Sequence, residues 1–231
     1  LPAAELYKKN ILTIRGSFRP VTKVNEDMYE KSLKIVKNNK SFNDKNSISI
    51  FEITLSNLIA DGKVNEQDFL DRAQLLCSMG KTVMITNFQE YYKLSEYYNK
   101  YTDKKIVLTM GVDNLIQVFE DKYYKDLNGG ILEAFGNLFS QNVTVLLYPM
   151  MKEDRLIDSN NLVVNNKMKN LYKFFKDNNK IVDIKDYNKK LLKIFSWKVL
   201  ENIRKGKKDW EKDIPKNVSD LIKKKKLFGY S

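Results

Sequence analysis

The residues best placed to do chemistry lie near the start of the chain. An apolar run over residues 11–14 leads into Gly16, Ser17 and Phe18, and a polar stretch follows Pro20. This order predicts a strand, a short loop and then the first turn of a helix. Backbone N–H groups of such a loop and the positive end of a helix dipole converge on an anion. We therefore expect a phosphate-bearing ligand at this loop, although Gly16 also suits a turn that simply needs conformational freedom.

One count limits that chemistry sharply. The chain has no histidine, which excludes histidine acid–base catalysis, a Ser-His-Asp triad and histidine metal ligation. Its single cysteine, Cys77, falls in a helical pattern and argues against a disulfide framework or a cysteine metal site. We expect Cys77 to be a small buried side chain.

The elements that must position the loop alternate along the chain. Strands are expected over residues 11–14, 48–55, 82–86, 105–110 and 143–148. Helices are expected over residues 27–37, 65–79, 90–101 and 131–139, with a turn at Asp61 and Gly62 and a cap at Asn65, and a further helix is expected after residues 110–115, through about residue 124. This alternation predicts an α/β fold, a Rossmann-like doubly wound parallel sheet of about five strands. Gly111 follows the fourth strand, where the backbone of such a sheet can approach a ligand, and Asp113 follows it.

The rest of the chain divides coarsely. We expect a lead-in over residues 1–10, the Rossmann-like domain over 11–155, and a helical C-terminal subdomain over 156–231 packed on the same core. Since the chain begins with Leu1, we expect an upstream region or a larger assembly. No apolar run is long enough to cross a membrane and no signal peptide is evident, so we expect a cytoplasmic or organellar-matrix protein that is not secreted.

The first loop resembles one superfamily, the HxGH nucleotidyltransferases, and within it the nicotinate/nicotinamide mononucleotide adenylyltransferases. Their first strand ends in G-[ST]-F-[DN]-P-[VI]-H-x-G-H. The same frame here reads Gly16-Ser17-Phe18-Arg19-Pro20-Val21-Thr22-Lys23-Val24-Asn25. Thr22 and Asn25 thus stand at the positions of the two catalytic histidines, and Asn25 is also a natural helix cap.

Three later landmarks follow in the family's order. Gly111-Val112-Asp113 is similar to the family's G-[AS]-D turn, and Pro149 stands where an R-P-G turn is usual. The family's closing signature, which binds ATP phosphates, is retained at Ser196 and Arg204. It is altered at Phe195, Trp197 and Leu200, where Trp197 would fill the phosphate site. The chain also resembles the C-terminal half of long bacterial proteins labelled nicotinate-nucleotide adenylyltransferase.

The resemblance implies a mononucleotide and ATP site with a degenerate catalytic centre. Its nucleotide-binding residues would be Gly16, Ser17, Phe18, Arg19, Gly111, Asp113, Ser196 and Arg204. Asp113 is equally well explained as a helix cap, and Arg19 is expected to be the principal cation. Two functions stay open: an adenylyltransferase-like enzyme of NAD biosynthesis working with Mg²⁺, or a non-catalytic module that senses a nucleotide or builds a larger assembly.

Charge suggests a further partner. The chain holds 41 basic and 29 acidic residues, a formal charge of +12. Residues 198–226 hold eleven basic and five acidic residues, which is half of that excess. This tail is either a solvated helical face or a patch for RNA or an acidic partner.

Overall fold

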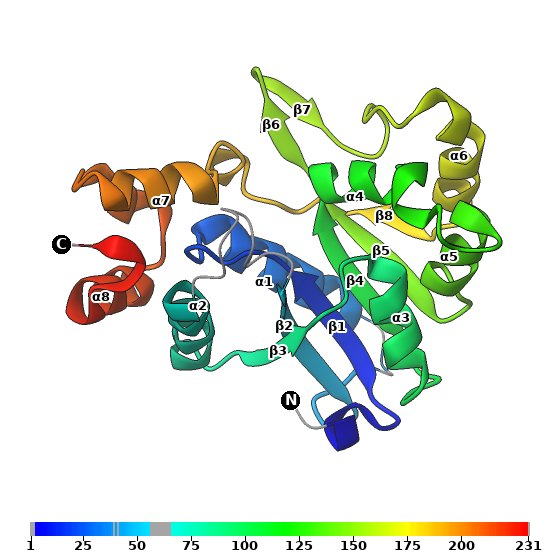
Figure 1. Ribbon diagram of the computed structural model, residues 1–231, viewed down its shortest axis with the longest axis horizontal. Coiled ribbons are helices and arrows are strands. Elements are labelled where there is room, and N and C mark those ends of the chain that lie inside the picture. Colours follow the sequence, from blue (N-terminus) through cyan, green and yellow to red (C-terminus); the bar gives the residue numbers. More distant parts are fainter. Residues whose placement is uncertain (1–2, 39, 41, 56–65, 231) are drawn as a thin grey trace.

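The apolar strands expected from the sequence form one sheet. Six parallel strands lie in the order β3-β2-β1-β4-β5-β8. They are β1 (Asn10–Arg15), β2 (Ser47–Thr54), β3 (Thr82–Thr86), β4 (Ile106–Gly111), β5 (Val143–Tyr148) and β8 (Ile181–Asp183). β6 (Met150–Lys152) and β7 (Arg155–Ile157) form a separate antiparallel hairpin. The computed structural model, shown in Figure 1, describes residues 3–38, 40, 42–55 and 66–230.

Helices cover both faces of the sheet. They are α1 (Lys23–Lys37), α2 (Glu66–Ser78), α3 (Tyr91–Asn99), α4 (Val112–Val118), α5 (Gly130–Leu138), α6 (Lys169–Asp177), α7 (Ser196–Arg204) and α8 (Lys216–Lys225). Side chains alternate along each strand, so that Ile11 belongs to the apolar core that includes residues of α3, α4, α5 and α6, while Leu12 belongs to the core that includes residues of α1, α2, α7 and α8. Two apolar cores, one on each face, therefore hold a doubly wound α/β sheet, as predicted.

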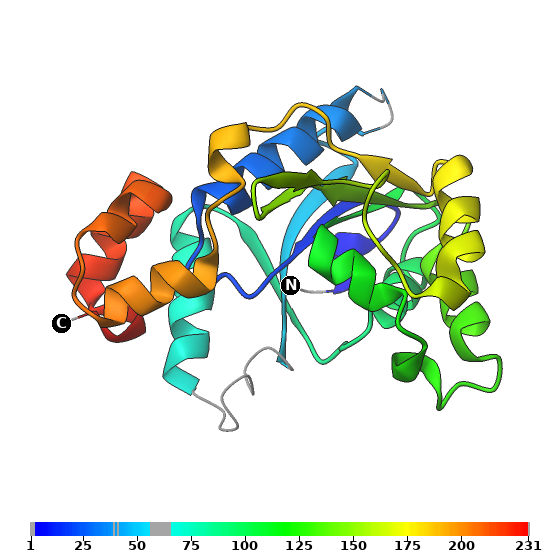
Figure 2. The ribbon, with the colours of Figure 1, turned by 90° about the horizontal axis from the view of Figure 1, so that it is seen from above.

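The C-terminal helices lie at one end of the molecule. Figures 1 and 2 both place α7 and α8 beside α2, away from α5 and α6. Val199, Trp210 and Ile222 bury their side chains there. The backbone N–H of Phe228 also donates to the Asp71 carboxylate of α2 at 3.0 Å. No described helix is long and apolar enough to span a membrane.

Several expectations need correction. The sheet has six strands rather than about five, because β8 comes from the segment expected to be helical; its three residues are too few to show a period. α1 begins at Lys23 rather than near residue 27. α4 ends at Val118, and a separate 3₁₀ turn spans Asp121–Tyr124. Cys77 is exposed rather than buried.

Other expectations are not decided by this structure. The turn at Asp61 and Gly62 and the cap at Asn65 lie outside the described residues. The domain boundary near residue 155 stays a prediction. β8 belongs to the main sheet, α6 packs in the same core as α3, α4 and α5, and α7 and α8 pack in the same core as α1 and α2.

Candidate functional site

A cavity of about 540 Å³ opens at the carboxyl ends of β1 and β4. β1 and β4 are the two central strands between which the chain winds in opposite directions. Open α/β sheets bind ligands at this switch point, because the loops leaving the two strands diverge and leave a crevice. The cavity is therefore the leading candidate site.

The structure brings together five of the positions singled out in the sequence. Gly16 and Ser17 from the first loop, Asn25 from α1, and Gly111 and Asp113 from the β4–α4 turn all line the cavity. They come from two loops nearly a hundred residues apart, and the parallel pairing of β1 with β4 places both loops at one edge.

Phe18 plays a different part from the expected one. Its side chain is 1% exposed and its ring packs on Phe51, 5.4 Å between centroids, so it supports the loop from below. Its backbone has a φ of 47°, which holds the loop in a tight turn. A Cβ at Gly16 would lie 3.1 Å from the Phe18 ring, a tight contact that only a small shift of the ring would relieve.

Thr22 and Asn25 bond to each other at the start of α1. Asn25 Oδ1 accepts from the Thr22 backbone N–H at 2.8 Å and from the Thr22 hydroxyl at 3.0 Å. Such a box satisfies backbone groups that the first turn of a helix leaves without partners. Thr22 is buried and does not line the cavity, whereas Asn25 does.

Arg19, Ser196 and Arg204 lie outside the cavity lining. Arg19 Nε donates to the Asp68 carboxylate of α2 at 2.6 Å, and Asp68 also pairs with Arg72. Arg204 is exposed at the end of α7. Phe195 lines the cavity just before α7, but Trp197 is 60% exposed and does not fill it.

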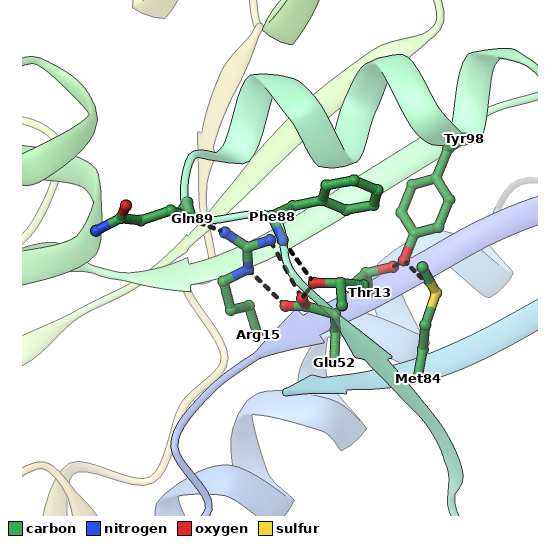
Figure 3. Close-up of polar contacts among 8 residues, drawn as sticks. Thr13, Arg15, Glu52, Met84, Phe88, Gln89 and Tyr98 are labelled. Atoms are coloured by element: carbon green, nitrogen blue, oxygen red, sulfur yellow. Dashed lines mark hydrogen bonds and ion pairs between the residues drawn. The ribbon is translucent and has the colours of Figure 1, made fainter. Parts of the chain in front are cut away.

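The floor of the cavity holds an ion pair that sequence analysis did not assign. Arg15 Nε donates to Glu52 Oε2 at 2.5 Å, and Glu52 is fully buried (Figure 3). The Thr86 hydroxyl also donates to Glu52, and Arg15 Nη1 donates to the Gln89 carbonyl at 3.1 Å. The cluster ties together the carboxyl ends of β1, β2 and β3. One signal for it was present: Glu52 stands within the apolar run of β2, where a charge needs a partner.

Tyr91 closes the floor from the start of α3. Its ring lies over the Arg15 guanidinium, 4.4 Å from carbon to centroid, and its side chain is 8% exposed. Its hydroxyl has no hydrogen bond of ordinary geometry with a described residue, although the Asn114 side chain lies close enough to interact with it. Burial raises the pKa of Tyr91 to about 12, against the opposing effect of Arg15.

Tyr148 is another tyrosine that lines the cavity. Its hydroxyl donates to Asp27 Oδ2 at 2.6 Å, and the same oxygen accepts from the Asn188 backbone N–H at 3.1 Å. Burial, and then the bond to Asp27, raises the pKa of Tyr148 well above its usual value. Tyr148 therefore stays protonated and holds α1, β5 and the 188 loop together.

The described side chains that line the cavity carry a slight net negative charge. Arg15 is the only cationic side chain among the described residues that line it, and Glu52 neutralises it. Glu90 and Asp113 also line the cavity; Glu90 pairs with Lys93 at 2.7 Å, whereas no ion pair to Asp113 occurs in the described part of the chain. No described group of three or more His, Cys, Asp or Glu side chains could hold a metal ion.

Comparison with known proteins identifies the fold. No protein-family model and no curated protein matches the sequence. Among solved structures, this chain is similar to the Plasmodium falciparum nicotinic acid mononucleotide adenylyltransferase complexed with APC. The TM-score is 0.56 at 14% identity, over 96% of this chain and 98% of that one. The chain shares the overall fold of that enzyme. At this identity the likeness establishes the fold alone.

Proposed function

We propose that this chain is a nucleotide-binding domain of the mononucleotide adenylyltransferase type. The observation that carries the proposal is the cavity between β1 and β4, which both the Gly16-Ser17 loop and the Gly111–Asp113 turn line. The Plasmodium enzyme of similar fold, which was solved with APC bound, supports the same assignment.

The proposed domain binds without efficient adenylyl transfer. The chain has no histidine, and Thr22 and Asn25 are committed to the cap of α1. Neither side chain carries the positive charge that stabilises a transferring phosphoryl group. Each preorganised donor lost from such a site costs roughly 10²–10³ in rate. We propose that any Mg²⁺ enters with the phosphates of a nucleotide, and that a role in NAD biosynthesis, if retained, is regulatory rather than catalytic.

Calorimetric titration tests this function. The purified chain is titrated with AMP, ATP, nicotinate mononucleotide and nicotinamide mononucleotide, each with Mg²⁺, and the product dinucleotide is assayed in parallel. We expect micromolar binding of at least one nucleotide with no dinucleotide above background. Absence of binding for all four nucleotides would contradict the proposal. Formation of the dinucleotide at an ordinary enzymatic rate would favour an active adenylyltransferase instead.

A second function rests on the C-terminal helices. Several exposed cations of residues 198–226 have no ion pair in the described part of the chain: Arg204, Lys207, Lys208, Lys216, Lys224, Lys225 and Lys226. The exposed Trp197 ring lies nearby in sequence, with Lys198 Nζ 5.2 Å from its centroid. Surfaces that bind single-stranded RNA without sequence specificity combine lysines that contact the backbone phosphates with aromatic rings that stack on the bases.

RNA binding has a clear signature. We expect affinity for a single-stranded RNA to fall steeply with salt, and a Lys224→Gln, Lys225→Gln, Lys226→Gln variant to flatten that slope by about two to three. A slope that the triple variant leaves unchanged would remove this second function.

A further inference from the structure

Resting on the proposed nucleotide-binding function, the charges of the cavity lining and the buried Tyr91 hydroxyl restrict the class of ligand. Triphosphate sites present several cations or metal ligands to the phosphates. Here the single cation that lines the cavity among the described residues, Arg15, already bonds to Glu52 through Nε at 2.5 Å and Nη2 at 3.3 Å.

The carboxylates make this deficit larger. Asp113 lies on the first turn of α4 at the cavity wall and is exposed. Glu90 also lines the cavity, with Lys93 as its ion-pair partner. A polyanion in the cavity would therefore meet repulsion without a compensating cation, whereas an uncharged nucleoside would not.

The remaining lining suits a flat, polar, weakly charged body. Tyr91, Tyr123, Tyr124, Tyr148 and Phe195 supply aromatic surface. The hydroxyls of Tyr124 and Tyr148 are occupied by Val118 O at 2.8 Å and Asp27 at 2.6 Å. The Tyr91 hydroxyl, in contrast, is buried at the floor without a hydrogen bond of ordinary geometry. A buried polar group without a hydrogen bond lowers the stability of the folded protein unless a ligand or water bonds to it.

We infer that the cavity selects a nucleoside or nucleoside monophosphate over a nucleoside triphosphate, and that the Tyr91 hydroxyl hydrogen-bonds a neutral polar group of that ligand. A hydrogen bond to the ligand thus gives the buried Tyr91 hydroxyl a partner of ordinary geometry. Discrimination against the triphosphate comes from Asp113 and from the commitment of Arg15 to Glu52.

Two pairs of variants test this inference on the full chain. Calorimetric titrations use adenosine, AMP, ATP, nicotinamide riboside and nicotinamide mononucleotide, at 0.15 M salt so that the lysine-rich surface is screened beyond about 8 Å. Tyr91→Phe is matched by Tyr172→Phe, whose hydroxyl bonds to Ser159 O at 2.7 Å outside the cavity lining. Asp113→Asn is matched by Asp103→Asn, an exposed carboxylate just before β4, at the opposite edge of the sheet.

For the wild type we expect ATP without Mg²⁺ to bind about tenfold more weakly than AMP. Tyr91→Phe should weaken the tightest nucleoside about tenfold and change the melting temperature little, since the hydroxyl makes no hydrogen bond of ordinary geometry with a described residue of the free protein. Tyr172→Phe should lower the melting temperature and leave binding unchanged. Asp113→Asn should raise ATP affinity several-fold relative to nucleoside affinity, while Asp103→Asn should leave this ratio unchanged.

The outcomes separate the two levels of the proposal. If none of the five compounds binds, both this inference and the proposed function fail. If ATP binds as tightly as AMP without Mg²⁺, or if Tyr91→Phe binds every ligand like the wild type, the inference fails while the nucleotide-binding function stands.

Discussion

Asn25 Oδ1 accepts two hydrogen bonds from Thr22, one from its backbone N–H and one from its hydroxyl. These are the two residues that stand where the resembling family has catalytic histidines. Their mutual bonding means that both side chains stabilise the first turn of α1.

This pairing predicts a stability effect at Asn25. Asn25→Ala removes the acceptor of both bonds and should lower the free energy of unfolding by about 1 kcal/mol. Asn25→Asp keeps an acceptor oxygen in the same place, now on a carboxylate next to the positive end of the helix, and should retain most of the stability that alanine loses. Urea denaturation monitored by circular dichroism measures both. A loss that Asp does not restore would mean that the cap is not what Asn25 contributes.

The ion pair under the cavity predicts a larger effect. Glu52→Gln leaves the Arg15 guanidinium, 7% exposed, without its counter-charge and should cost about 3–5 kcal/mol. Removing both charges together, in Arg15→Met with Glu52→Gln, should cost less than Glu52→Gln alone, because no uncompensated charge then remains buried. Equilibrium unfolding measures the free energy of unfolding of the two variants. A double variant that is less stable than Glu52→Gln alone would show that the ion pair itself is strongly stabilising.

The sequence was informative wherever a contact is local or repeats along a strand. β3 and β5 have the bounds expected from their apolar residues, and the order of strands and helices made the parallel sheet predictable. The two loops that line the cavity could be found because glycine and turn residues follow an apolar strand. Their meeting at one edge then follows from parallel pairing alone.

What could not be predicted depends on contacts between distant segments. Arg19 looked like a phosphate ligand because its partner, Asp68, is 49 residues away on a helix of its own. The Arg15–Glu52 bond spans 37 residues, and nothing in either strand specifies which buried charge meets which. β8 was missed because three residues at a sheet edge carry too weak a pattern.

Buried tyrosines predict weakness in alkali. Burial raises the pKa of each of five tyrosines above the usual value of about 10: Tyr91, Tyr98, Tyr124, Tyr148 and Tyr172. Above about pH 10 the unfolded chain releases these protons while the folded chain keeps them, so the free energy of unfolding falls as pH rises. Each such group adds a slope of up to about 1.4 kcal/mol per pH unit.

Urea midpoints between about pH 8 and pH 11 measure this slope. Tyr172→Phe should reduce it by one proton, whereas Tyr7→Phe, at a tyrosine that is 61% exposed, should leave it unchanged. A urea midpoint that stays constant through this range would show that folding does not raise the pKa of the buried tyrosines.

Arg19 predicts a separation of binding from stability. Its Nε lies 2.6 Å from Asp68, its side chain is 14% exposed, and it does not line the cavity. Arg19→Ala should therefore lower the free energy of unfolding by about 2 kcal/mol through loss of a charged hydrogen bond, and leave nucleotide affinity within about twofold. Arg155→Ala, at an exposed arginine of β7, controls for loss of charge and should change neither quantity. Denaturant titration and calorimetry on the same samples measure the two effects. If Arg19→Ala weakens a nucleotide tenfold or more while the protein stays folded, Arg19 must leave Asp68 to reach the ligand, and the cavity would have the phosphate cation that its free form lacks.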